Sequence, residues 1–178
     1  MKFQRCLICG EVYMGTDKPS NCPFCGAPGK YLVLHDEWID ENLSLGELSG
    51  ISRKNLEKAL QLEVNNSPFY RDAMGRTKSL ALQAIFKYLA KIEGEHASAV
   101  RKILNCQMIE PEPGKEVALD DDRANVEAAH KREVAATAFY KKAADEAVEP
   151  RVKKVFTALS EIESDHIDLE AALLEKMD

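Results

Sequence analysis

Two stretches of the chain place a glutamate three residues before a histidine, at Glu93-x-x-His96 and at Glu163-x-x-His166. Residues three apart lie on one face of a helix, so each stretch can present a carboxylate and an imidazole to the same point. Such oxygen and nitrogen donors are common ligands of iron, manganese and zinc. One copy alone would be interpreted as a solvated face of an acidic helix, so the case for a metal site depends on further residues joining the pattern.

A displacement of 70 residues relates these two stretches, and the same displacement relates much more of the chain. A glutamate and a tyrosine that precede each stretch also recur, Glu63 as Glu133 and Tyr70 as Tyr140. The repeat contains no gap and includes matched apolar positions, so it predicts a duplicated helical hairpin. The two copies are residues 53–104 and residues 123–174.

Both glutamates of the repeated stretches follow an apolar stripe at helical spacing. Phe86 and Leu89 precede Glu93, and Phe156 and Leu159 occupy the matching places in the second copy. The stripes direct both carboxylates into a core, where a charge without a partner is costly. Something inside the predicted bundle must therefore neutralise them.

Metal cations would neutralise the complete set of inward carboxylates and imidazoles. The set is Glu63, Glu93, His96, Glu133, Glu163 and His166. One Glu from each of two helices, with Glu-x-x-His from each of the other two, is the ligand pattern of di-iron and di-manganese carboxylate bundles. Tyr70 and Tyr140 lie one heptad after a ligand candidate, where a phenol can donate to a metal-bound carboxylate. Ordinary core tyrosines fit the same spacing.

Four predicted helices position these residues. Their expected bounds are about 52–74, 80–105, 120–149 and 150 to near the C-terminus. Ser49 or Ser52 is the expected N-cap of the first helix. Pro68 lies inside that helix, where it removes an amide donor and disfavours the helical conformation of the residue before it. A kink, or a break just before Tyr70, is therefore expected.

The connector between the second and third helices, residues 105–119, is long for a turn and has no helical period. Fully extended it would reach about 50 Å, whereas a helix of about 24 residues is about 36 Å long. It can therefore traverse the bundle and start the third helix at the end where the second begins. The predicted fold class is mainly α, a ferritin-like four-helix bundle with one long crossover.

A cysteine motif precedes the bundle, with Cys6-x-x-Cys9 and, twelve residues later, Cys22-x-x-Cys25. Two such turns close a tetrahedral site of four sulfurs that suits zinc or iron, and the spacing does not separate the two metals. A unit this short needs its metal to fold. A zinc ribbon that only folds or docks is the alternative to a redox-active iron site. The predicted domains are a metal domain with these four cysteines over residues 1–35, a linker over residues 36–50 and the bundle over residues 51–178.

Composition restricts the partners. The net charge is -6, the isoelectric point is near 5.4, and acidic and basic residues are interspersed, so no nucleic-acid partner is expected. No membrane association is expected either, because no apolar run of about 18 residues exists. The N-terminus lacks the apolar core of a signal peptide, and four of the five cysteines have metal-site rather than disulfide spacing. A cytoplasmic protein is expected.

The cysteine unit, with its sequences Cys-Leu-Ile-Cys-Gly and Cys-Pro-Phe-Cys-Gly, resembles the rubredoxin-like module of rubrerythrins. With the bundle included, the whole chain resembles the rubrerythrin family in reversed domain order, rubredoxin-like module first. The resemblance implies bridging roles for Glu93 and Glu163, terminal roles for Glu63 and Glu133, and one imidazole per metal. It also implies reduction of hydrogen peroxide to water at a di-iron centre, with electrons supplied through the rubredoxin-like iron.

The sequence departs from that family pattern at one position. Peroxidase-type rubrerythrins carry a second glutamate on the third helix, just after the first, and here the residue three after Glu133 is Ala136. The six remaining ligands form a symmetric set closer to the ferroxidase centres of ferritins. Iron oxidation or iron handling is therefore the alternative to peroxide or dioxygen reduction.

The expected partners follow from the redox hypothesis. They are hydrogen peroxide or dioxygen, and an electron donor that is either a rubredoxin or a reductase linked to NAD(P)H. Because a flexible linker does not guarantee contact between the two metal sites of one chain, a homodimer is predicted, with each rubredoxin-like module near its neighbour's bundle.

Overall fold

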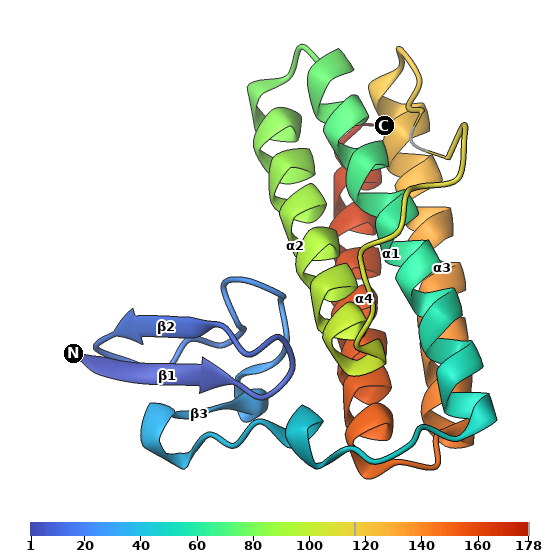
Figure 1. Cartoon of the computed structure of the whole chain (residues 1–178). Helices are drawn as coiled ribbons and strands as arrows, with labels where there is room; N and C mark the ends of the chain where they lie inside the picture. The colour runs from blue at the N-terminus through green and yellow to red at the C-terminus, as the bar shows by residue number, and fades with distance from the viewer. Residues whose placement is uncertain (116, 178) are drawn as a thin grey trace.

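The structure is a computed structural model, which describes residues 1–115 and 117–177. Four helices lie side by side in a bundle, and a small sheet unit lies against the flank of one end (Figure 1). The helices are α1 (Gly50–Arg76), α2 (Leu80–Leu104), α3 (Asp122–Glu146) and α4 (Pro150–Glu175). The predicted fold class is confirmed.

Local sequence signals fix the helix ends. The side chain of Ser49 accepts a hydrogen bond from the amide of Ser52, and that of Asp121 caps α3 in the same way through the amide of Ala124. Pro150 begins α4, where its missing amide hydrogen has no cost. These caps place the helix ends within a few residues of the predicted bounds.

The crossover between α2 and α3 runs along the length of the bundle, so that α3 begins at the end where α2 begins (Figure 1). Side chains of α1 hold it in place. The amide of Glu112 donates to Asn65 Oδ1 at 2.8 Å, and the amide of Ala118 donates to Asp72 Oδ2 at 2.8 Å. The one-crossover topology expected from connector length is thus present.

Of the two outcomes predicted at Pro68, a break just before Tyr70 is wrong, because α1 continues without interruption through Pro68, and a kink stays a prediction. An internal proline costs a helix about 3 kcal/mol through one lost hydrogen bond and a clash. Tertiary contacts on both sides outweigh that cost. Phe69 and Tyr70 are buried directly after it, and Ser67 Oγ donates to the carbonyl of Ala90 on α2 at 2.8 Å.

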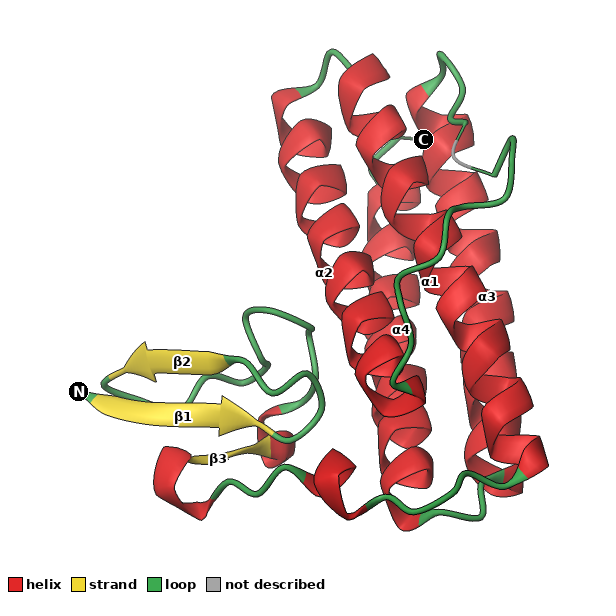
Figure 2. Cartoon of the chain, viewed as in Figure 1, coloured by secondary structure: helices red, strands yellow, loops and turns green. Residues whose placement is uncertain are grey.

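The N-terminal unit is a three-stranded antiparallel sheet in the order β2-β1-β3 (Figure 2). Its strands are β1 (Lys2–Cys6), β2 (Val12–Gly15) and β3 (Leu32–Leu34). The connector after β3 contains two 3-10 turns, and Trp38 between them packs back on the sheet unit. Its indole donates to the carbonyl of Cys6 at 3.2 Å, and the Arg5 guanidinium lies 3.4 Å from the ring centroid.

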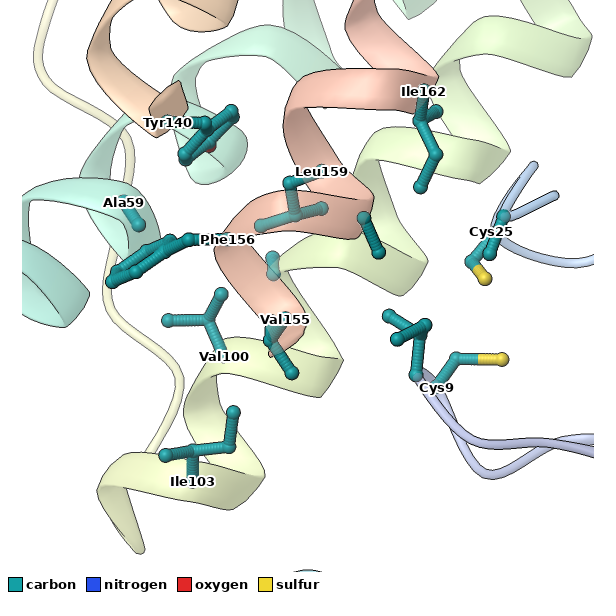
Figure 3. Packing of buried hydrophobic residues seen from close by; sticks show 14 of the residues in the cluster. Cys9, Cys25, Ala59, Val100, Ile103, Tyr140, Val155, Phe156, Leu159 and Ile162 are labelled. Carbon is teal, nitrogen blue, oxygen red and sulfur yellow. The ribbon is translucent and has the colours of Figure 1, made fainter. Parts of the chain in front are cut away.

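One hydrophobic cluster spans both units, since the four paired-motif cysteines share it with buried residues of the bundle such as Ile92 and Ile162. Figure 3 shows Cys9, Cys25 and Ile162 of this cluster. Arg151 of α4 adds a polar anchor. Its guanidinium donates to the carbonyls of Leu7 at 2.5 Å and Ile8 at 3.0 Å. The unit therefore docks on the bundle of its own chain. The homodimer was predicted because such contact within one chain was not guaranteed, and that argument no longer holds. The homodimer itself stays a prediction.

No helix within the described residues combines the length and the apolar composition that crossing a lipid bilayer requires.

Candidate metal centres

All four helices contribute side chains to a polar cluster in the middle of the bundle. Its members are Glu63 of α1, Glu93 and His96 of α2, Glu133 of α3, and Glu163 and His166 of α4. All six side chains are buried. They form two overlapping groups of four, and within each group the ligand atoms lie within 4.8 Å of one another. Glu93 and Glu163 belong to both groups, which is the arrangement that bridging carboxylates need.

The Nδ1 atom of each imidazole faces the carboxylates. His96 Nδ1 lies 3.2 Å from Glu163 Oε1 and 3.5 Å from Glu63 Oε2. His166 Nδ1 lies 2.9 Å from Glu163 Oε2 and 3.6 Å from Glu93 Oε1. The two rings are nearly parallel, with centroids 6.4 Å apart. One imidazole is thus available on each side of the shared carboxylates.

The donor atoms of this cluster make no hydrogen bonds to groups outside it, which is the test of whether the residues fit a metal. Both oxygens of Glu93 and of Glu163, one oxygen each of Glu63 and Glu133, and Nδ1 of both histidines are buried without a hydrogen bond among the described residues. The short distances between Glu163 and the two imidazoles join ligand candidates to one another. Buried polar atoms are otherwise nearly always paired. Bound cations would satisfy these atoms, so the cluster fits a pair of metal ions of the di-iron type.

Burial and mutual repulsion perturb the carboxylates of the protein without metal. Burial raises the pKa of Glu93 well above its ordinary value, and the nearby charge of Glu163 raises it further. Burial likewise raises the pKa of Glu133. Burial opposes ionisation of Glu163 too, but His96 and His166 lower the pKa of that carboxyl below its ordinary value. Glu163 is therefore the most readily ionised of these three carboxyls.

Two buried phenols complete the carboxylate shell. Tyr70 donates a hydrogen bond to Glu133 Oε1, and Tyr140 donates one to Glu63 Oε1. Burial, aided by the adjacent carboxylates, raises the pKa of both tyrosines well above the ordinary value, so both remain neutral donors. Each phenol fixes one oxygen of its carboxylate and leaves the other directed to the cluster. The register of Tyr70 thus matches that of Tyr140, although Pro68 precedes it in α1.

The four cysteines of the N-terminal unit form a second cluster, with all four sulfurs within 4.8 Å of one another. Cys6 and Cys25 Sγ are 3.8 Å apart, and Cys9 and Cys22 Sγ are 3.9 Å apart. A tetrahedron with metal–sulfur bonds of about 2.3 Å has sulfur–sulfur edges of about 3.8 Å. Disulfide bonds would bring two sulfurs to about 2.05 Å. The spacing fits one metal ion held by four thiolates.

His96 connects the two clusters directly. While its Nδ1 faces the carboxylates, its Nε2 donates to the backbone carbonyl of Cys25 at 2.9 Å. That hydrogen bond fixes the tautomer that leaves Nδ1 free to bind a metal. Gly26, the next residue, permits the approach, because a Cβ there would lie 3.1 Å from Ile162. A candidate ligand of the bundle site, His96, is thus hydrogen-bonded to the backbone of a candidate ligand of the cysteine site, Cys25, within one chain.

Comparisons with known proteins agree with this geometry. The rubrerythrin family model matches residues 54–174, and the model described as the rubredoxin-like domain of rubrerythrin matches residues 4–32. The chain belongs to the rubrerythrin family. It is 30% identical over 141 residues to reverse rubrerythrin-1 of Clostridium acetobutylicum, covering 71% of this chain and 70% of that protein. A solved structure of a hypothetical protein from Pyrococcus furiosus shares the fold, with a TM-score of 0.62 and 23% identity over 70% of this chain and 88% of that one.

This rubrerythrin has a buried alanine at the α3 position where the sequence lacks a further carboxylate. Ala136, one turn after Glu133, is 4% exposed and lines a surface pocket between α1 and α3. Among the described residues, the two four-residue groups of the bundle contain only the six residues predicted from the repeat. The symmetric ligand set is therefore a property of the folded bundle.

A cavity of about 330 Å³ reaches the cluster from the crossover side. Its lining includes Glu63, Ser67, Pro68 and Gly94 from the α1–α2 hairpin, together with Met108 from the crossover. Gly94 contributes no side chain there, and a Cβ at this position would have Ser67 Oγ as its nearest neighbour, at 3.8 Å. The cavity offers a small molecule a route to one side of the candidate metal site.

Sequence reasoning missed one carboxylate of this rubrerythrin. Glu170 of α4 is 1% exposed and its Oε1 lies 3.0 Å from the phenol oxygen of Tyr70. It lies two helical turns after Glu163 on the same face, and that heptad spacing was the available signal. The repeat concealed it, because the residue 70 positions earlier is Val100.

The stability of the protein without metal in the bundle should fall as pH rises from about 4.5 to about 8. Burial raises the pKa of Glu170 to about 8, and the pKa values of Glu93 and Glu133 are also raised. Groups that hold protons more tightly when folded stabilise the fold below their unfolded pKa and lose that effect as pH rises to the folded pKa. Glu163, whose pKa is lowered, stays ionised throughout this range. We expect a Tm lower by about 3 °C or more at the upper end.

Thermal unfolding after chelation, followed at both ends of that range, measures this effect. A Glu133→Gln variant removes one of the repelling carboxyls and should show a smaller dependence on pH. Adding a divalent metal should raise Tm most at high pH, because ligands must lose their protons to bind. A Tm that does not vary with pH would show that the carboxyls do not share a buried core.

Proposed function

We propose that this rubrerythrin reduces hydrogen peroxide, or dioxygen, to water at the bundle site, using electrons relayed from an iron held by the four cysteines. The observation that carries the proposal is the position of His96, with one ring nitrogen among the carboxylates and the other on the carbonyl of Cys25. A purely structural zinc site gains only docking from this contact. An electron carrier gains a short route through one side chain.

The proposed ligand roles follow from which residues the two groups share. Glu93 and Glu163, which belong to both groups, would serve both irons, while Glu63 and His96 would complete the ligands of one iron and Glu133 and His166 those of the other. The proposed ligands of the mononuclear iron are Cys6, Cys9, Cys22 and Cys25. Iron held by these residues would supply the redox chemistry, namely the two electrons that cleavage of the O–O bond requires and their replacement through the four-cysteine site.

The protein's own side chains position the proposed ligands and shape the space that the oxidant enters. Tyr140 and Tyr70 hold the terminal carboxylates in fixed positions, which keeps the free oxygen of each directed inward. The cavity at Glu63 admits a molecule the size of peroxide, and the apolar walls around the cluster exclude bulk water. Charges that develop at the bound oxidant are thereby met by preorganised groups.

The wider assignments extend this proposal. The electron donor is a reductase linked to NAD(P)H, or a rubredoxin, that contacts the four-cysteine module, and the protein acts in the cytoplasm in oxidative stress defence. Residues 1–35 form the electron-carrying domain, residues 36–50 the linker and residues 51–178 the catalytic domain. The position of the sheet unit at the flank of the bundle (Figure 2) supports docking of such a donor on the module.

Iron oxidation is the second candidate function, and a specific observation favours it. Ala136 occupies the place of the further α3 carboxylate, which leaves the symmetric six-ligand set. Such a site can oxidise Fe(II) with the metal as substrate. That function gives the four-cysteine module no role, and the contact between Cys25 and His96 then has no consequence.

Metal content and a single turnover test the proposed function. Protein purified from an iron-replete culture should contain about three irons per chain and show thiolate-to-iron absorption. That absorption should bleach on reduction and return within one turnover when one equivalent of peroxide is added. Glu93→Gln, which removes a proposed bridging ligand, should keep the thiolate spectrum but lose its rapid return.

The two candidate functions give different results in this experiment. Zinc at the cysteines with iron in the bundle, or a thiolate iron that peroxide leaves reduced, would contradict the peroxidase proposal and favour iron oxidation. Catalytic consumption of peroxide with NADH and a reductase would contradict the iron-handling alternative.

Widening the gap between the two sites should slow electron transfer without loss of metal. Gly26 and Gly10 follow the second cysteine of their respective motifs, with φ of 76° and 85°. An alanine strains the backbone equally at both positions, but only at Gly26 does its Cβ meet the bundle, 3.1 Å from Ile162. At Gly10 the nearest neighbour is Trp38 at 3.8 Å.

Stopped-flow measurement of thiolate-iron reoxidation compares the two variants. Gly26→Ala should slow reoxidation severalfold, whereas Gly10→Ala, the matched control for backbone strain, should leave the rate near that of the unmodified protein. Equal slowing in both variants would assign the effect to strain in the knuckles and would contradict a route through Cys25 and His96.

A further inference from the structure

Residues 108–111 of the crossover form a roof over the hairpin of α1 and α2. Two side chains of α1 hold this part of the chain. Gln61 Nε2 donates to the carbonyl of Glu110 at 3.4 Å, and Asn65 Oδ1 accepts from the amide of Glu112 at 2.8 Å. A lysine and an alanine stand 70 positions after these two residues. The side chains that hold the roof are thus found only in the first half of the repeat.

The cavity of about 330 Å³ lies beneath this roof and reaches one side of a symmetric ligand set. Its lining includes Met108 of the roof, Gly94 of α2 and Glu63 of α1. Glu63 Oε2 is buried without a hydrogen bond among the described residues and lies 3.5 Å from His96 Nδ1. A molecule in the cavity therefore approaches the side of the cluster that His96 also connects to Cys25.

Gly94 determines how much room this cavity offers. It lies inside α2, where a glycine destabilises a helix relative to alanine. Close packing does not require the glycine, because a Cβ there would have Ser67 Oγ as its nearest neighbour, at 3.8 Å. The residue 70 positions later, Ser164 of α4, is exposed. The missing side chain at Gly94 thus costs helix stability and leaves space beside the cluster.

The walls of the cavity suit a small uncharged molecule. The hydroxyl of Ser67 is already engaged, since it donates to the carbonyl of Ala90 at 2.8 Å and accepts from Arg71 Nη2 at 2.9 Å. Apart from Glu63, the charged residues of the lining are Arg71 and Glu110, which are exposed and opposite in sign. Neither an anion nor a cation is attracted by both. The apolar side chains of the lining are Val64, Pro68, Ala97, Met108 and Pro111.

We propose that this cavity is the entry port for the oxidant, and that Gly94 and Met108 make the port selective for hydrogen peroxide over hydroperoxides with a bulky alkyl group. The proposal rests on the proposed function, since peroxide is the oxidant that the bundle site would reduce. Oxidant and electrons then reach the cluster on the same side, that of Glu63 and His96.

Association of nitric oxide with the reduced, iron-loaded protein tests the port without turnover. Nitric oxide is small and uncharged, and its binding to ferrous iron is followed by visible absorption. Gly94→Leu fills the cavity, so association should slow about tenfold because the leucine must move aside first. Ser164→Leu makes the matched change after the other shared glutamate and should leave the rate unchanged. An unchanged rate in Gly94→Leu, or equal slowing in both variants, would overturn the proposal.

Turnover with two hydroperoxides tests the selectivity. For the unmodified protein, kcat/KM for hydrogen peroxide should exceed that for tert-butyl hydroperoxide about 100-fold, because the alkyl group does not fit the port. Met108→Ala widens the roof and should reduce this ratio severalfold. Gln107→Ala changes the neighbouring residue, which is outside the lining, and should leave the ratio unchanged. Equal use of both hydroperoxides by the unmodified protein, or an unchanged ratio in Met108→Ala, would contradict the assignment.

Gly94→Ala separates a blocked port from a folding defect. Alanine favours the helix, so Tm should rise by about 2 °C. The added methyl group narrows the port, so kcat/KM for peroxide should fall severalfold while kcat stays the same. A variant that is more stable and yet slower to take up peroxide is not explained by misfolding. A stabilised variant with unchanged kcat/KM would show that Gly94 does not limit entry.

The failure of this proposal and that of the proposed function are distinguishable. Unchanged nitric oxide association in Gly94→Leu, in a protein that still reduces peroxide, would overturn the port and leave the peroxidase intact. An unmodified protein without peroxidase activity would overturn the proposed function, and nitric oxide association would still decide whether small molecules enter at Gly94.

Discussion

The repulsion among buried carboxyl groups is the constraint on which the bundle depends. Glu63, Glu93, Glu133 and Glu163 meet in its core with most of their inward oxygens unpaired among the residues that the structure describes. In the absence of cations such groups take up protons or destabilise the fold. The apolar stripes that bury them, the phenols that hold the outer oxygens and the imidazoles that face inward all become favourable together once positive charge is bound. Metal binding and folding of this core are therefore linked.

The N-terminal sheet unit, with its cysteine cluster, packs directly beside this carboxylate core. The cysteine motif closes a sulfur cluster at the flank of the bundle, Gly26 allows its second knuckle to approach α2 and α4, and Arg151 anchors the first knuckle from α4. Because His96 contacts both clusters, the packing of the two units determines how the two candidate sites lie relative to each other. A change that loosens the docking should affect the proposed electron route before it affects either candidate metal site.

The repeat made most of the bundle site predictable, since a ligand set duplicated at fixed spacing is visible without any structure. The same reasoning missed Glu170, because only residues that recur in both halves were considered and the residue 70 positions before Glu170 is Val100. The break predicted at Pro68 is absent. Helix propensity is a local property, whereas the contacts of Phe69 and Tyr70 that keep α1 continuous are tertiary. Docking of the sheet unit on its own bundle was missed for a related reason. Periodicity reports which face of a helix is apolar and not which surface covers it.

The central claim is that both metal sites of one chain work together, and a complementation measurement tests it most directly. One variant, Cys9→Ser with Cys22→Ser, lacks the thiolate site, and a second, Glu93→Gln with Glu163→Gln, lacks the bundle site. Each should be inactive in peroxide turnover with an electron donor, and an equimolar mixture, refolded together, should stay inactive because neither chain holds a complete pair. Activity near a quarter of that of the unmodified protein, as expected when half of the dimers are mixed and each mixed dimer holds one complete pair, would contradict the account and would show electron transfer between chains of a homodimer.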